Sequence, residues 1–97
     1  MVEIVVSNRA EQELRNIWRY IARENPAAAD KILLRIDAKL QLLREFPEIG
    51  TPRDDIRSGA RMLVEGNYLL LYEHLQKNAV VELVCVVDGR RDLTNLF

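Results

Sequence analysis

The stretch that decides the fold is residues 80–92, which read VVELVCVVDGRRD. Apart from Glu82, every residue from 80 to 87 is apolar, and such a run predicts a buried strand. Asp88-Gly89 follows directly and predicts a turn where the strand ends. The strand therefore delivers arginines and aspartates to one end of a sheet, where they either carry out chemistry or bind a partner.

Two more strands precede this one and are joined to it by short turns. Residues 61–65 and 68–75 are rich in apolar and aromatic residues, and Gly66-Asn67 between them is a tight-turn signal. Residues 76–78 give a second turn signal before the last strand. Two tight turns in succession predict an antiparallel meander of three strands.

The N-terminal part has the period of helices, after a short strand at residues 2–6. Asn8 with Glu11 three residues later predicts the start of a first helix, since these side chains can hydrogen-bond its free backbone amides. One apolar stripe runs along this helix, with Trp18 expected in the core and Tyr20 off the stripe. The stripe consists of Leu14, Ile17, Trp18 and Ile21.

A second helix is predicted from Pro26 to about Glu45. Asn25 can cap its start, and proline is tolerated at the first helical position. The connection to the first helix is so short that the two must form an antiparallel hairpin. The apolar stripe of the second helix consists of Ala29, Ile32, Leu33, Ile36, Leu40 and Leu43.

These elements predict an α+β fold in a single domain, residues 1–97. It has two layers in the order β-α-α-β-β-β, with the helix hairpin packed on an antiparallel sheet. The strands 68–75 and 80–87 are apolar on both faces, whereas the hairpin covers one face only. We therefore expect the second face of the sheet to be an interface with a partner.

Composition excludes several classes of function. A net charge of -1, from 14 basic and 15 acidic residues, argues against bulk binding of nucleic acid. One cysteine, Cys85, and one histidine, His74, supply neither a disulfide framework nor a metal site, and no cofactor is expected. No apolar run approaches the roughly 20 residues of a membrane span, and no signal peptide is evident. We expect a cytoplasmic protein.

Arginines recur near the strand ends and allow two interpretations. Arg53, Arg57 and Arg61 are spaced four residues apart, and with Arg90 and Arg91 they could converge at one edge of the sheet to bind a target. Alternatively they pair within the chain. The available partners are Asp54, Asp55, Asp88 and Asp92. The two interpretations are compatible, since a paired arginine can still contact a partner.

The order of elements, with particular residues at particular places, resembles the ParE/RelE superfamily of bacterial toxins. The resemblance covers essentially the whole chain, and the two-helix start and the Arg-Asp after the last strand are more similar to ParE than to RelE. The segments that carry it are Ala10-Glu11, Glu13-Leu14, Ile17, Tyr20-Ile21-Ala22, Asn25-Pro26, Ala28-Ala29, Leu43, Phe46-Pro47, Ile49-Gly50, Arg53, Arg61, Tyr68, Tyr72, Val84, Val86 and Gly89-Arg90-Arg91-Asp92.

The resemblance to ParE implies the toxin of a type II toxin–antitoxin system, a plasmid-stabilisation function. Such a toxin inhibits DNA gyrase and is neutralised by a ParD-like antitoxin in a hetero-oligomer. The alternative is a RelE-like, ribosome-dependent mRNA endonuclease, which would use Arg53, Arg57, Arg61 and Arg91 on the phosphate. A third possibility is a non-toxic module of the same fold that only binds an antitoxin.

The residues favour a binding inhibitor over an enzyme. Where RelE-like relatives carry an arginine, a histidine and a C-terminal tyrosine, this chain has Leu69, Asp88 and Phe97. His74 is the only imidazole, and no partner that would orient it is evident from the sequence. We expect no direct binding of nucleic acid and no membrane contact.

Two sets of binding residues are predicted, and no catalytic residue. The candidates for contact with the target are Arg53, Arg57, Arg61, Asp88, Arg90, Arg91 and Phe97. The candidates for contact with the antitoxin are Tyr68, Leu70, Tyr72, Val84 and Val86.

Overall fold

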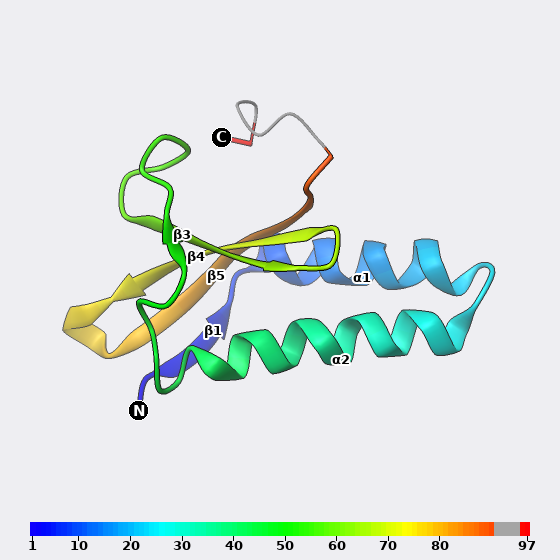
Figure 1. The fold of residues 1–97 in the computed structure, drawn as a ribbon, viewed down its shortest axis with the longest axis horizontal. Coiled ribbons are helices and arrows are strands. Elements are labelled where there is room, and N and C mark those ends of the chain that lie inside the picture. Colours follow the sequence, from blue (N-terminus) through cyan, green and yellow to red (C-terminus); the bar gives the residue numbers. More distant parts are fainter. Residues whose placement is uncertain (91–95) are drawn as a thin grey trace.

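The computed structural model describes residues 1–90 and 96–97, which form two helices packed on one five-stranded sheet (Figure 1). The predicted α+β architecture is confirmed. The elements are β1 Glu3–Val6, α1 Asn8–Ala22, α2 Pro26–Leu42, β2 Thr51–Pro52, β3 Ala60–Glu65, β4 Tyr68–Leu75, the 3₁₀ turn η1 Gln76–Asn78 and β5 Val80–Asp88.

The sheet has the strand order β1-β5-β4-β3-β2 and is mixed. β3, β4 and β5 form the predicted antiparallel meander, whereas β1 lies parallel to β5, which corrects the expectation of a wholly antiparallel sheet. The reason is the hairpin of α1 and α2, which returns the chain to the end of the sheet where β1 begins. The backbone N–H of Val2 donates to the Arg44 carbonyl (3.1 Å), so the chain leaves α2 beside the start of β1. β3 and β5 both run in the same direction as β1.

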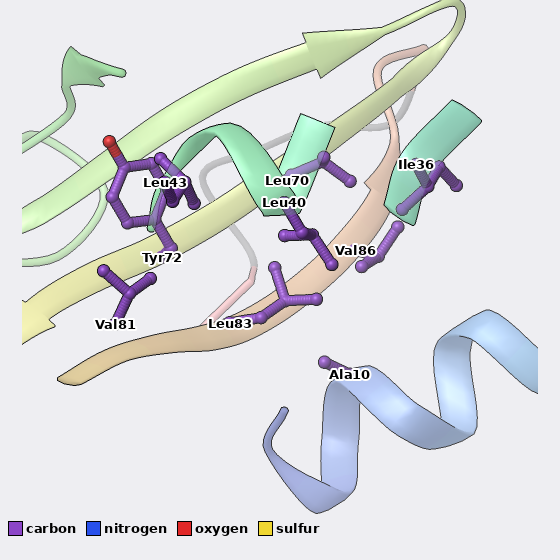
Figure 2. Packing of buried hydrophobic residues seen from close by; sticks show 9 residues of the cluster. All are labelled: Ala10, Ile36, Leu40, Leu43, Leu70, Tyr72, Val81, Leu83 and Val86. Carbon is purple, nitrogen blue, oxygen red and sulfur yellow. The ribbon is translucent and has the colours of Figure 1, made fainter. Parts of the chain in front are cut away.

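The main core lies between the helices and the sheet (Figure 2). Its buried members are Ala10, Ile36, Leu40, Leu43, Leu70, Tyr72, Val81, Leu83 and Val86. A β-bulge shapes this face: Tyr72 is opposite Leu83, but Leu71 is opposite Cys85, so Val84 is an extra residue on β5. Because of this insertion, both Leu83 and Val86 point toward the helices (Figure 2).

A smaller core lies on the other face of the sheet. Leu71 and Cys85, 1% and 0% exposed, pack there with Leu96 and with Ile56 from the loop before β3. The remaining members are Ala60, Met62, Leu69 and Val87. The apolar residues of these strands are thus buried beneath the chain's own loop and Leu96, and they do not form the exposed apolar patch on which the expectation of a partner rested. Figure 1 shows the C-terminal end across the strands from the helix pair.

Three local predictions need correction. The side chain that caps α1 is Ser7, whose Oγ accepts from the Ala10 backbone N–H (3.0 Å), and the helix begins at Asn8 itself. The second helix ends at Leu42, earlier than expected. Trp18 is 37% exposed, because its indole N–H reaches across the hairpin to Asp30 (2.8 Å) and so lies at the edge of the core.

Other local predictions are confirmed. Asn25 caps α2, its side chain accepting from the Ala28 N–H (3.0 Å), and Tyr20 is exposed. Gly66 has a φ of 58°, as the tight turn between β3 and β4 requires. Among the described residues, neither helix is long and apolar enough to cross a membrane.

Candidate functional site

Among the described candidates, Arg61 and Arg90 do not lie at the same edge of the sheet. Arg61 lies opposite Tyr72, whereas Asp88 lies opposite Tyr68, so the two positions are four residues apart along β4. That spacing corresponds to about 13 Å. β4 lies between β3 and β5 and is antiparallel to both, so β3 and β5 run in the same direction. The end of β5 is therefore level with the end of β3, whereas Arg61 lies at the beginning of β3. Arg91 and Asp92 lie outside the described residues.

The arginines around β2 and β3 are engaged within the chain. Arg53 forms a two-pronged contact with Asp55, both N–O distances being 2.9 Å, and Arg57 Nε lies 3.0 Å from a carboxylate oxygen of Glu73. The hydrogen bond to Asp55 raises the pKa of Arg53 and, reciprocally, lowers the pKa of the Asp55 carboxyl. Arg61 donates to backbone carbonyl oxygens in the loop before β2. The acceptors are the oxygens of Glu48 (2.9 Å) and Gly50 (2.8 Å). Pairing within the chain, the second interpretation of the arginines, is confirmed for Arg53.

The opposite end of the sheet also carries an intramolecular pair. The Arg90 guanidinium contacts both carboxylate oxygens of Asp88, and the Arg90 backbone N–H donates to Asp88 Oδ1 (2.9 Å). The Asp88 contact raises the pKa of Arg90. Burial, followed by the charge of Asp88, raises the pKa of the neighbouring Tyr68. At neutral pH this end is therefore an ion pair beside a protonated phenol.

An open groove of about 480 Å³ runs between α1 and this end of β5. Its walls are Glu13, Asn16, Ile17, Tyr20, Tyr68, Val86, Val87, Asp88 and Arg90. Tyr20 is 72% exposed, so one wall presents an aromatic ring to solvent. The groove combines apolar and aromatic surface with one ion pair, which suits a peptide better than a small ion.

The floor of the groove is the outer edge of β5 beyond its pairing with β1. The register with β1 ends at Leu83, and side chains of the α1 segment then take over the strand's backbone groups. Ser7 Oγ donates to the Val84 carbonyl (2.7 Å), and Glu13 accepts from the Val86 N–H (2.9 Å). A peptide that adds as a strand at this edge has to displace Glu13.

The candidates for antitoxin contact are mostly inside the protein. Leu70 and Tyr72 are 0% exposed, Val86 is 2% exposed and Val84 is 6% exposed. Leu70, Tyr72 and Val86 face the helices, since their alternation is that of the main core. Of this set, Tyr68 and Val86 line the groove, and only Tyr68 is more than marginally exposed. Ile17 and Tyr20 on the opposite wall were not predicted as binding residues. Their proximity depends on how α1 packs against β5, which periodicity does not specify.

The Phe97 ring is in contact with two guanidinium groups, and the one from Arg9 was not predicted. The Arg9 and Arg57 guanidinium carbons lie 5.0 and 5.2 Å from the centroid of the Phe97 ring. Arg9 also donates to the Leu96 carbonyl (2.9 Å). Arg9 is far from Phe97 in sequence, so no local pattern predicts this contact.

His74 has a partner that the sequence analysis did not find. Its Nδ1 lies 3.3 Å from a carboxylate oxygen of Glu48, which also accepts from the Gln76 amide (3.1 Å). His74 and Arg61 line the same hollow, of about 250 Å³. Among the described residues, no three His, Cys, Asp or Glu side chains are grouped as a metal ion would need.

The fold is shared with solved structures of bacterial toxins. The chromosomal ParDE toxin–antitoxin system from P. aeruginosa matches with a TM-score of 0.73 at 18% identity, over 91% of this chain and 96% of that chain. The isolated E. coli RelE toxin matches with a TM-score of 0.68, also at 18% identity, over 95% of this chain and 88% of that chain. At this level of identity the likeness defines a fold class, that of the small ParE/RelE toxins.

The family is defined by sequence. The model of the ParE toxin of the type II toxin–antitoxin system parDE matches residues 4–93, and the chain belongs to this family. A curated relative, Toxin ParE1 of Caulobacter vibrioides, is 28% identical over 68 residues, which are 69% of this chain and 71% of that protein. The protein is thus a ParE-family toxin of a type II toxin–antitoxin system, and an antitoxin is its expected partner.

Proposed function

We propose that this toxin inhibits DNA gyrase and is neutralised by a ParD-like antitoxin. The observation that carries the proposal is the ParE family match, which runs from β1 through the charged segment after β5. Gyrase inhibition requires a binding surface and no general base, and the chain offers exposed Phe97 beside Arg57 as such a surface.

The state of the phenolic groups supports a binding function. Tyr72 is buried, and its hydroxyl accepts from the Gly50 N–H (2.8 Å). Burial raises the pKa of Tyr72 and of Tyr68, so neither phenol readily becomes a base at neutral pH. Asp88, at the position of a relative's histidine, pairs with Arg90.

One observation favours a second candidate, the RelE-like endonuclease. His74 is oriented by Glu48 and shares a hollow with Arg61, which is the geometry of an imidazole base beside a cation. However, Arg61 already donates to two backbone carbonyls, which occupies Nη1 and leaves that nitrogen little capacity to bind a phosphate.

The two candidates separate in one pair of assays. The purified toxin is titrated into a gyrase supercoiling reaction and, in parallel, into translating ribosomes with a reporter message. We expect supercoiling to be inhibited, the message to stay intact, and the antitoxin encoded beside the toxin to relieve the inhibition. Message cleavage that is lost in His74→Gln would overturn the proposal in favour of the endonuclease, and inactivity in both assays would favour a non-toxic antitoxin-binding module.

The groove between α1 and β5 is the antitoxin surface that we propose. Tyr20→Ala removes its most exposed aromatic wall and is expected to weaken antitoxin binding by about tenfold, as loss of an aromatic anchor does. Leu34→Ala is the matched control, since Leu34 is an exposed apolar residue on the other helix, 69% exposed. Titration calorimetry measures both variants, and equal affinity losses would place the antitoxin elsewhere.

A further inference from the structure

Three segments that are distant in the sequence meet at the Phe97 ring. Arg9 comes from the first turn of α1, Arg57 from the loop before β3, and Phe97 follows the buried Leu96. The two guanidinium carbons lie 5.0 and 5.2 Å from the ring centroid, within the range of a cation–π contact. Phe97 nevertheless stays 56% exposed, so the contacts hold the ring without burying it.

Each arginine is itself held by a carboxylate on a regular element. Arg57 Nε lies 3.0 Å from Glu73 on β4, and Arg9 Nε lies 3.4 Å from Glu13 on α1. These carboxylates set the direction of the two guanidinium groups and balance their charge. The arginines are therefore arranged to hold the aromatic ring more than to offer free positive charge to an anion.

The residue before Phe97 fixes the backbone on the same site. Leu96 is 6% exposed and packs with Leu71, Cys85 and Val87 on the second face of the sheet. Its carbonyl accepts a hydrogen bond from Arg9 Nη1 (2.9 Å). Leu96 thus anchors this point inside the protein while Phe97 is directed to the surface.

We infer that Arg9 and Arg57 are positioning residues, which clamp Phe97 so that one aromatic ring is presented to the target in a single orientation. The inference rests on the proposed function in that Phe97 is the residue which meets gyrase. It assigns a role to Arg9, which the sequence did not single out, and gives Arg57 a role through Phe97 and not through direct contact with the target.

The accessibility of Cys85, the only cysteine of the chain, tests whether the clamp exists in the absence of gyrase. Cys85 is 0% exposed and lies in the cluster that Leu96 covers, so release of Leu96 exposes its thiol. The rate of Cys85 labelling by an aromatic disulfide reagent is measured in Arg9→Ala, Arg57→Ala, the double variant and Phe97→Leu. We expect an increase of roughly 2- to 5-fold for each single arginine change, from cation–π contacts at exposed sites. We expect roughly 5- to 25-fold for the double variant and for Phe97→Leu, which each lose both contacts.

Two variants serve as controls. Arg15→Ala removes an exposed arginine of the same helix, paired with Glu11, and is expected to leave labelling and gyrase inhibition unchanged. Arg9→Lys keeps the charge but loses the planar donor, and is expected to give an intermediate labelling rate. Far-ultraviolet circular dichroism checks that each variant is folded. If the double variant does not fold, the single changes and Phe97→Leu decide the question.

The supercoiling assay completes the test. The inference predicts that the toxin concentration for half-inhibition rises in the same variants, and in the same order, as the labelling rate. Unchanged labelling in the arginine variants would show that there is no clamp, and faster labelling with full gyrase inhibition would show that the clamp does not position a target contact. If the unaltered toxin leaves gyrase active, the proposed function and the positioning role fail together, while labelling still decides whether the clamp exists.

Discussion

The two faces of the sheet are covered in different ways. On one face, α1 and α2 bury a large cluster that includes Leu70 and Leu83, both 0% exposed. On the other face, Leu71 and Cys85 are equally buried, but among the described residues their cover is an irregular loop with Ile56, together with Leu96. The strands are therefore buried to the same extent on both faces, by regular helices on one face and by irregular chain on the other.

The difference explains why one face was predictable and the other was not. An amphipathic helix has an apolar stripe of fixed period, so the helices that cover the first face can be predicted from the sequence. A loop and a chain end have no period, and their apolar residues look like isolated exposed ones. The apolar second face was consequently attributed to a missing partner, although the chain covers it.

The largest expected effect compares the two faces at adjacent residues of β4. Leu70→Ala is expected to lower the free energy of unfolding by about 4 kcal/mol and Leu71→Ala by about 2–3 kcal/mol, because the loop and Leu96 can close part of the cavity whereas the packed helices cannot. Urea unfolding measures both. Leu34→Ala, 69% exposed, makes the same chemical change and should stay within about 0.5 kcal/mol. A larger loss for Leu71→Ala would mean that the loop is the more rigid cover.

A smaller effect is expected where the main core meets the loop before β2. Tyr72→Phe leaves the Gly50 N–H without its acceptor and is expected to cost about 1–3 kcal/mol. Tyr20→Phe, at an exposed tyrosine, should cost almost nothing. Gly50→Ala should also destabilise the fold, because an added Cβ would lie 2.6 Å from the Tyr72 hydroxyl oxygen and 2.9 Å from the Met62 carbonyl oxygen. If Tyr72→Phe is as stable as the parent, water takes the place of the hydroxyl.

The smallest effect is expected at Ser7, whose side chain connects the start of α1 with β5. Ser7→Ala removes the cap of α1 and the hydrogen bond to the Val84 carbonyl, and is expected to cost about 1 kcal/mol, a typical value for a lost cap. Asn8→Ala is the matched change one residue later and should be nearly neutral. Thermal unfolding of the two variants distinguishes them, and the reverse order would restore Asn8 as the cap.

Much of the fold could be predicted, and the exceptions have physical causes. The bounds of β4 were predicted without error, because Gly66-Asn67 and residues 76–78 mark both of its ends. The direction of β1 was not predicted, since strand pairing depends on where the helix hairpin returns the chain. The bulge at Val84 was also missed, because an unbroken apolar run hides a change of face.

The candidate site could be predicted only in part. The sequence singled out Tyr68, Asp88, Arg90 and Phe97, which all lie at or near the surface, as residues of interest. Convergence of Arg61 with Arg90, one of the two interpretations, does not hold, because spacing along the chain carries no information about which end of the sheet a residue reaches. Arg9 and Tyr20 emerged only from contacts between segments far apart in sequence.

By itself, the sequence determined that two amphipathic helices and an apolar meander form an α+β fold, and it carried the ParE family resemblance. Periodicity, caps and turn residues act over a few positions, so they can be recognised without the fold. Only the tertiary structure decided that Ile56 and Leu96 pack on the second face, that the charged groups lie at two ends of the sheet, and that Arg9 and Arg57 both contact the Phe97 ring. These arrangements depend on packing between distant segments, which no local pattern encodes.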